Sequence, residues 1–159
     1  MFIKSLTPLF FLSAMSVGAV AAANDPPPPA PPYGAPITLG QAKAVAAAVD
    51  AELAREKIDG AVIAVVQPDG SLVYFEKMDH STYVSNEFAL AKARTAAVTL
   101  HATGGFGPGM SSPPLPDLIG LPGGVPIVVG GKTIGAVGVS GVEGGGDGKV
   151  AAIGAEALK

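Results

Sequence analysis

Cysteine is absent from this 159-residue chain, and histidine occurs only twice, at His80 and His101. Without cysteine the chain cannot form a disulfide framework, a zinc site with thiolate ligands or a cysteine nucleophile. Two histidines are too few for a multi-histidine metal cage within one chain. Charged residues make up only 14% of the chain, and its net charge is −3 with no basic run. Binding of nucleic acid through neutralised phosphates is therefore not expected.

The first 36 residues are interpreted as two segments that precede the folded domain. Lys4 is followed by an apolar stretch over residues 6–20 and then by small residues, a pattern typical of a secretory signal peptide over residues 1–23. An uncleaved membrane anchor is the alternative. The proline-rich residues 24–36 predict an extended linker, or else a ligand for a proline-recognising module. We therefore expect a secreted or periplasmic protein whose folded domain covers residues 37–159.

Apolar periodicity in this domain predicts a helix, a hairpin, a second helix, a glycine-rich loop, a second hairpin and a closing helix. Two hairpins with interspersed helices favour an α+β fold, in which helices pack on an antiparallel sheet. The continuous apolar run at residues 61–67 indicates a strand that is covered on both faces. The predicted strands are 61–67, 72–78, 125–129 and 133–140, and the second and third helices are 85–100 and 147–158.

Capping residues define the expected ends of the first two helices. Thr38 and Gln41 form a capping-box pattern at the start of the first helix, and Asp59-Gly60 is expected to end it. Ser85 is the expected N-cap of the second helix. The apolar face of that helix would be formed by Phe88, Ala91, Thr95 and Val98.

Two glycine-rich segments approach known catalytic motifs but lack required residues. Residues 143–150 (EGGGDGKV) resemble a phosphate-binding loop, yet glutamate replaces its first glycine and valine replaces its Ser or Thr. Residues 138–142 resemble a nucleophile elbow, with valine in place of the second glycine. Nothing in the sequence pairs a nucleophile with an oriented base, so a non-enzyme is favoured over an enzyme.

His80 is the first candidate for a ligand-binding residue. It follows the second predicted strand and has Met78, Asp79 and Tyr83 close by in the sequence. A histidine at the end of a strand can ligate a haem iron or a transition metal. The alternative is an exposed histidine in a loop. Met78 and Tyr83 are included with His80 in the predicted binding site.

Three further candidates lie on or after the second predicted helix. His101 follows its C-terminal end, where the negative end of the helix dipole favours an imidazolium, and metal ligation is the other interpretation. Lys92 and Arg94 lie near its middle and could pair with the carboxylates of a ligand, such as haem propionates. The alternative is that Lys92 and Arg94 are solvated surface charges with no ligand.

An ordered set of motifs resembles the GlcG/HbpS-like haem-binding family. The segments that carry the resemblance are 73–79, 91–97 (AKARTAA), 121–127 (LPGGVPI) and 134–141 (IGAVGVSG). The resemblance implies a profilin-like α-β-α sandwich with helices on both faces of about five antiparallel strands, a common sheet size. It also implies assembly into octamers, haem as a cofactor in some members, and a membrane sensor kinase as partner in others. Family members commonly have glycine at the position of His80, so this side chain is either a new ligand or a surface change.

The remaining features concern glycine, aromatic residues and assembly. Phe106 lies within the sequence GFGPG and could stack on a flat ligand, or else anchor the core. Gly135, Gly138 and Gly141 recur in strand-like sequence and indicate close approach of another backbone, a ligand or a second subunit. The low charge content favours a homo-oligomer, because a small monomer with so few charges would expose much apolar surface.

These observations lead to three functional hypotheses. The first is an exported haem-binding protein for haem capture, storage or sensing. The second is an oligomeric accessory or scaffold protein with a protein partner. The third is an enzyme that acts on a small metabolite or on haem itself.

Overall fold

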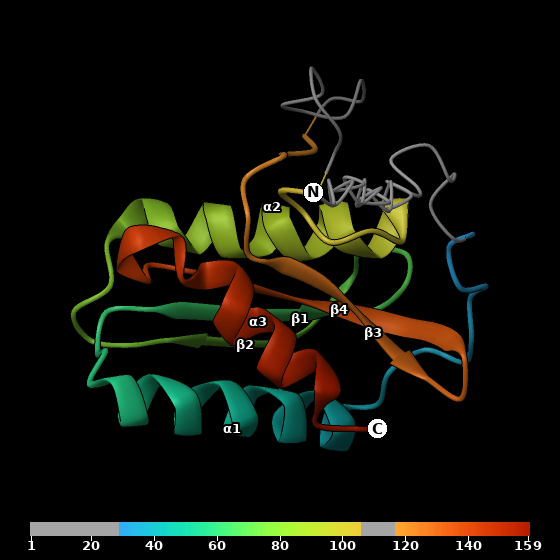
Figure 1. The fold of residues 1–159 in the computed structure, drawn as a ribbon, viewed down its shortest axis with the longest axis horizontal. Coiled ribbons are helices and arrows are strands. Elements are labelled where there is room, and N and C mark those ends of the chain that lie inside the picture. The colour runs from blue at the N-terminus through green and yellow to red at the C-terminus, as the bar shows by residue number, and fades with distance from the viewer. Residues whose placement is uncertain (1–28, 106–116) are drawn as a thin grey trace, which may run out of the picture.

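The computed structural model describes residues 29–105 and 117–159. Its elements are α1 (Leu39–Glu56), β1 (Val62–Val66), β2 (Leu72–Lys77), α2 (Tyr83–Thr99), β3 (Gly124–Val129), β4 (Lys132–Ser140), the 3₁₀ turn η1 (Glu143–Gly145) and α3 (Asp147–Glu156). The strands are antiparallel to their neighbours, in the order β2-β1-β4-β3. Figure 1 shows α2 over one face of this sheet and α1 and α3 over the other. The expected α-β-α sandwich is confirmed, with four strands in the described residues where the resemblance implied about five.

The central strand β1 contributes to both hydrophobic cores. All five of its residues are buried, as expected of a continuous apolar run between two helical layers. Because side chains alternate along a strand, Val62, Ala64 and Val66 pack beneath α2, while Ile63 and Val65 pack beneath α1 and α3. The prediction that this strand is covered on both faces is confirmed.

The end of the proline-rich segment packs on the folded domain. A parallel bridge joins Tyr33 to Thr133, and the Gly34 amide donates to the Thr133 carbonyl oxygen at 2.8 Å. The Tyr33 hydroxyl donates to the carbonyl oxygen of Ala97 at 3.2 Å. The segment therefore extends the sheet beside β4, at residues that β1 does not reach.

The start of α1 follows the sequence prediction, but its end does not. Thr38 accepts a hydrogen bond from the Gln41 amide, and the Gln41 side chain accepts one from the Thr38 amide, so the capping box is confirmed. The helix ends at Glu56 rather than at Asp59-Gly60, and its C-cap Lys57 has a left-handed conformation with φ 60°. The Ile58 amide closes the end by donating to the Leu53 carbonyl oxygen at 2.9 Å. No glycine marks Lys57, so the sequence prediction placed the end too late.

The second helix differs from the prediction in its cap and in its buried face. Its N-cap is Thr82, and the predicted cap Ser85 is buried in the first turn. Phe88 and Val98, predicted to face the core, are 37% and 41% exposed. The buried apolar residues of α2 are instead all small: Ala89, Ala93, Ala96 and Ala97.

Glycine in β4 explains why only small residues fit beneath α2. A Cβ atom on Gly138 would overlap the Ala89 carbonyl oxygen and lie 2.6 Å from the Ala93 amide nitrogen. The α2 backbone therefore rests almost directly on β4, and a Phe or Val side chain has no room between them. A Cβ on Gly135 or Gly141 would likewise overlap a backbone oxygen of this chain. The predicted close approach at these glycines is confirmed, and the approaching backbone belongs to the same chain.

The last helix, α3, ends at Glu156 rather than at residue 158. It buries small residues and one valine, namely Val150, Ala151, Gly154 and Ala155. None of the helices in the described residues is long and apolar enough to cross a bilayer. The predicted signal peptide over residues 1–23 and the predicted ligand residue Phe106 lie outside the described residues.

Candidate ligand-binding site

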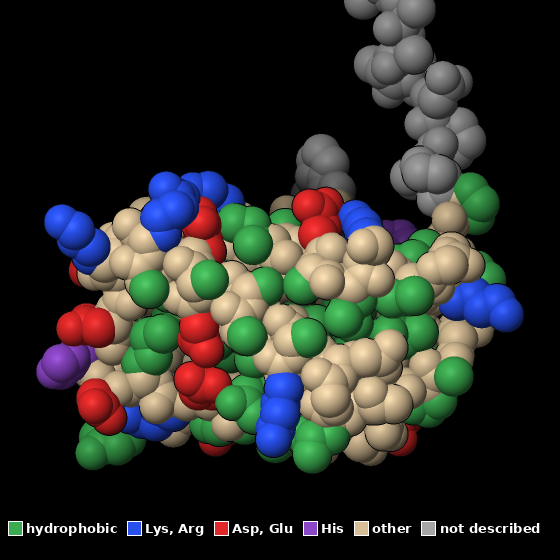
Figure 2. Space-filling model, turned by 90° about the horizontal axis from the view of Figure 1, so that it is seen from below, with side chains coloured by type: hydrophobic (Ala, Val, Ile, Leu, Met, Phe, Trp, Pro, Cys, Tyr) green, Lys and Arg blue, Asp and Glu red, His purple; other side chains and the backbone are tan. Residues whose placement is uncertain are grey.

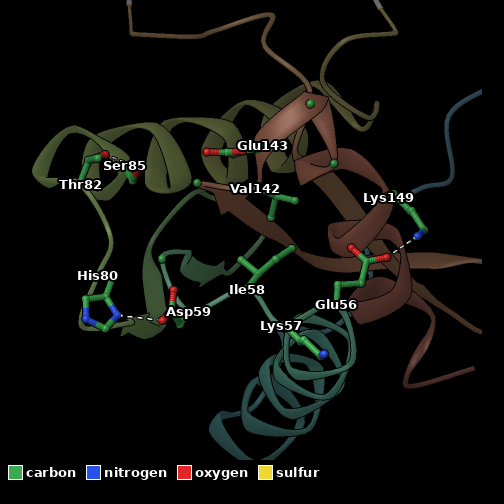
Figure 3. Close-up of a pocket in the computed structure, with 14 residues that line it drawn as sticks. Glu56, Lys57, Ile58, Asp59, His80, Thr82, Ser85, Val142, Glu143 and Lys149 are labelled. Atoms are coloured by element: carbon green, nitrogen blue, oxygen red, sulfur yellow. Dashed lines mark hydrogen bonds and ion pairs between the residues drawn. The ribbon is translucent and has the colours of Figure 1, made fainter.

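Three chain connections meet at one end of the sheet and form an open pocket of about 680 Å³. They are the α1–β1, β2–α2 and β4–α3 connections (Figure 3). In this view Ile58 and Val142 lie between the His80–Asp59 pair and the Glu56–Lys149 pair. The lining is therefore mostly polar, with two aliphatic side chains near its middle. The residues that line it are 56–60, 80, 82, 85, 141–144, 146 and 149.

His80 lies at the rim of this pocket and is paired with Asp59. The two side chains are 74% and 80% exposed, and the imidazole Nδ1 lies 2.9 Å from a carboxylate oxygen of Asp59. A carboxylate at this distance favours the tautomer with the proton on Nδ1, which donates to Asp59. No described residue hydrogen-bonds Nε2. The ring is therefore oriented with one nitrogen held and the other available, as in metal-ligating histidines.

The cations at the pocket differ in whether they are already paired. Lys149 donates to Glu56 at 2.6 Å and lies 3.6 Å from Glu52, and these partners raise the pKa of Lys149. The hydrogen bond from Arg55 lowers the pKa of Glu52 to about 2. Lys57 is exposed and forms no ion pair with the described residues. Unlike Lys149, Lys57 is therefore available to pair with an anionic ligand in this pocket.

A buried ion pair holds the glycine-rich wall of the pocket. Asp147 accepts a hydrogen bond from the Val142 amide at 2.8 Å through one carboxylate oxygen. Its other oxygen accepts one from Lys92 Nζ at 2.6 Å, and Lys92 is 3% exposed. The same ammonium donates to the carbonyl oxygen of Val139 at 3.1 Å and contacts the Ser140 hydroxyl at 3.4 Å. Lys92 thus finds a carboxylate inside the protein and does not line the pocket.

Two other predicted residues lie near His80. Met78 is half-buried against the core, and its carbonyl oxygen accepts a hydrogen bond from the Ser81 hydroxyl at 2.7 Å. It borders a smaller depression next to the main pocket, which His80 and Asp59 also line. Tyr83 is 87% exposed, and Lys77 Nζ lies 5.8 Å from its ring centroid. Met78 and His80 therefore border the same depression, whereas Tyr83 lines neither that depression nor the main pocket.

Arg94 and His101 lie at the other end of the domain. Arg94 donates through Nε to the Gly70 carbonyl oxygen at 3.3 Å, in the turn before β2, whereas His80 follows β2. The six residues of β2 extend over about 17 Å, at about 3.3 Å per residue. His101 follows the far end of α2, whose 17 residues span about 25 Å at about 1.5 Å per residue. The two histidines therefore cannot ligate the same iron in one chain.

Among the described residues, no three His, Asp or Glu side chains come together as a metal site. A haem iron can be held by a single axial ligand from the protein. His80 can supply that ligand on its own.

Sequence reasoning missed Asp59, Lys57 and Lys149. Asp59 was assigned only to the end of the first helix. In an antiparallel hairpin the residue before the first strand faces the residue after the second, and the Met78 amide indeed donates to the Ala61 carbonyl oxygen. The predicted hairpin therefore contained the signal that pairs Asp59 with His80. No comparable signal identified the two lysines.

Comparison with known proteins agrees with the fold and the motifs. The family model described as "Haem degrading protein HbpS-like" matches residues 37–156. An uncharacterised 15.0 kDa protein from the dhaT-dhaS intergenic region of Citrobacter freundii is 35% identical over 116 residues, covering 67% of this chain and 81% of that protein. Protein GlcG of Escherichia coli K12 is 39% identical over 83 residues, covering 49% of this chain and 62% of GlcG.

Solved structures extend the likeness to three dimensions. The crystal structure of HbpS has a TM-score of 0.71 and 25% identity, over 80% of this chain and 93% of HbpS. The crystal structure of a PduOC:heme complex has a TM-score of 0.67 and 22% identity, over 78% of this chain and 96% of that chain, and it supports the fold alone. Because the family model spans the whole sandwich from Ile37 through Glu156, this chain belongs to the HbpS-like family.

Proposed function

We propose that this protein is an exported haem-binding protein in which His80 ligates the haem iron. The observation that carries the proposal is the His80–Asp59 pair at the rim of the pocket, which leaves Nε2 of His80 available. The family model is described as a haem-degrading protein, and a structure of the same fold is described as a heme complex. The family description supports haem as the ligand class for this chain.

The residues of the pocket fit haem in three respects. Its volume of about 680 Å³ lies within the range of about 300–1,000 Å³ that is typical of small-molecule sites. His80 supplies an axial ligand, and the unpaired Lys57 supplies a cation for a propionate. Ile58 and Val142 supply apolar contact for the ring. Haem brings the redox-active iron, and this chain binds and orients it.

The polar character of the pocket limits how haem can bind. Only two of its lining side chains are aliphatic, so much of the porphyrin would stay in contact with solvent or with another protein. Such exposure suits a protein that takes up haem and releases it again. We therefore favour haem capture or transfer over permanent storage, outside the cytoplasm as residues 1–23 predict.

Titration of the purified protein with hemin tests this function. The wild-type protein should give a saturable shift of the Soret band, and His80→Ala should lose the histidine-ligated spectrum. His101→Ala is the matched control, because this second histidine is exposed at the other end of the domain, and it should titrate like the wild type. An unchanged spectrum and affinity in His80→Ala would refute His80 as the ligand. The absence of saturable binding in the wild type would refute haem binding itself.

A further inference from the structure

Three aspartates of this chain are followed directly by glycine, at residues 59–60, 69–70 and 147–148. At such a step the glycine amide nitrogen can approach the aspartate side chain with no Cβ atom in its way. The nitrogen then attacks the carboxyl carbon, provided that the carboxyl group is protonated and that both groups are free to move. The structure restrains two of these steps firmly and the third only weakly.

The step at Asp69 is restrained by the turn between β1 and β2. Both carboxylate oxygens of Asp69 accept hydrogen bonds from Ser71, one from its amide and one from its hydroxyl, each at 2.9 Å. These bonds lower the pKa of Asp69 and so keep its carboxyl group ionised. The Gly70 amide donates to the Gln67 carbonyl oxygen at 2.9 Å. Both reacting groups of this step are therefore already engaged.

The step at Asp147 lies in the first turn of α3, and its carboxylate is held from two sides. One oxygen accepts a hydrogen bond from the Val142 amide at 2.8 Å, and the other accepts one from the Lys92 ammonium at 2.6 Å. Turning this carboxyl group toward the Gly148 nitrogen would break both bonds. It would also leave the buried Lys92 charge without its partner, which is costly.

The step at Asp59 lies in the connection between α1 and β1 and lacks these restraints. The Gly60 amide donates to no described residue. The Asp59 side chain is 80% exposed, and within the described chain its carboxylate bonds only to His80, which is 74% exposed. Figure 2 shows acidic side chains beside a histidine that projects into solvent at one end of the molecule. A bond between two such exposed side chains opens readily.

We propose that Asp59-Gly60 is the site at which this protein isomerises from aspartate to isoaspartate. The Gly60 nitrogen forms a bond to the Asp59 carboxyl carbon, while the amide proton and the carboxyl hydroxyl leave as water. The product is a cyclic succinimide. Water then adds to one of its two carbonyl carbons. Addition at the former main-chain carbonyl gives isoaspartate, in which the peptide bond runs through the side-chain carbon and the total mass is unchanged.

Isomerisation would separate His80 from its partner. In isoaspartate the free carboxylate is attached directly to the Cα atom, and the main chain gains one methylene group. The carboxylate therefore moves away from Nδ1 of His80. The longer main chain also lies at the pocket, because Gly60 lines it and packs so closely on Gly141 that a Cβ atom there would overlap the Gly60 carbonyl oxygen. This consequence for haem rests on the proposed function, whereas the covalent change does not.

Ageing of the folded protein at neutral pH tests the assignment. Asp-N protease cleaves before aspartate but not before isoaspartate, so resistance to cleavage before residues 59, 69 and 147 reports on each step separately. Resistance should develop at least about fivefold faster at Asp59 than at Asp69 or Asp147, because only its step opens without breaking buried or paired bonds. In urea all three steps lose their restraints, and their rates should agree within about threefold. Equal rates in the folded protein, or the same preference for Asp59 in urea, would overturn the assignment.

Hemin titration of the aged protein tests the consequence for the pocket. The fraction of wild-type protein that binds hemin tightly should fall by the fraction that carries isoaspartate at residue 59. Asp59→Glu is the matched control: it keeps a carboxylate but does not form the succinimide, so its hemin affinity should not change with age. If aged wild-type protein binds hemin like fresh protein, isomerisation does not disturb His80, and this consequence is wrong. Fresh protein that binds no hemin would refute the proposed function and this consequence with it, but not the cleavage result.

Discussion

Replacing Asp147 with asparagine would leave a buried ammonium without its negative partner. Lys92 is 3% exposed, and its Nζ lies 2.6 Å from an Asp147 carboxylate oxygen. Its other partners, the Val139 carbonyl and the Ser140 hydroxyl, are neutral. Asp147→Asn preserves the shape and the acceptor for the Val142 amide, but it removes the charge. The effect of this variant therefore reports mainly on the ion pair.

The expected loss of folding stability depends on the unequal burial of Lys92 and Asp147. Breaking a buried ion pair by removing one member costs about 3–5 kcal/mol. Asp147 is 15% exposed, which moves the cost of Asp147→Asn to the lower end, about 3 kcal/mol. Lys92→Met should cost less, about 2 kcal/mol, because Asp147 keeps the Val142 amide and some solvent contact. The double variant contains no buried charge, so it should be more stable than the sum of the single effects predicts.

Urea unfolding of the four proteins at neutral pH measures these differences. The double-mutant cycle should give a coupling free energy of about 2 kcal/mol, within the range for residues in direct contact. The wall of the pocket over residues 141–146 should also loosen in both single variants, which faster amide exchange at Val142 would show. An ordinary surface substitution changes the free energy of unfolding by no more than about 0.5 kcal/mol. If Asp147→Asn changes it by no more than that, the Lys92–Asp147 pair does not hold the pocket wall in place.

Two further predictions concern the glycines and the partly buried carboxyl group of Asp50. Gly138→Ala should lower the free energy of unfolding by about 1–3 kcal/mol, because the new methyl group overlaps the backbone of α2. Gly40→Ala, in the first turn of α1 with nothing near its added Cβ, should be neutral or stabilising, and equal effects of the two in thermal unfolding would contradict the packing argument. Burial and the nearby Glu76 raise the pKa of Asp50 from 3.8 to about 6. This carboxyl therefore stabilises the fold below about pH 4, and its contribution is lost as the pH rises through 6. At pH 7 Asp50→Asn should therefore be more stable than the wild type, by about 1 kcal/mol once solvent screening is allowed for. If the difference in unfolding free energy between the two proteins is the same at pH 4 and pH 7, the pKa of Asp50 is not raised in the folded protein.

Local sequence signals determined the parts of the fold that were predicted well. The capping box of α1 and the fully buried β1 each depend on a few neighbouring residues. The buried face of α2 could not be found in this way. Hydrophobicity favours Phe88 and Val98 as the core face, but the contact with Gly138 leaves space only for alanine. That constraint comes from a residue some fifty positions away and is not visible in the periodicity of the helix.

The candidate site shows the same division between local and distant signals. His80 was identified because it follows a predicted strand, and the pocket confirms that it lies at an opening. Lys92 was assigned to a ligand's carboxylate, whereas its carboxylate partner is Asp147, on an element much later in the chain. Arg94 and His101 were grouped with His80 only by their residue types. The lengths of β2 and α2 place them at the other end of the domain.

The role of Asp59 separates haem binding from stability most sharply. Its carboxylate and the His80 side chain are both largely exposed, so Asp59→Asn should change the stability by less than about 1 kcal/mol. Its effect on haem should be larger, because an asparagine amide can donate to Nδ1 and so move the imidazole proton to Nε2, the atom that must ligate iron. We expect a loss of hemin affinity of about 10- to 100-fold, as for other groups that orient a metal-ligating histidine. If hemin binds Asp59→Asn as tightly as the wild type while the urea curves coincide, Asp59 does not set the tautomer, and His80 would have to bind iron without its help.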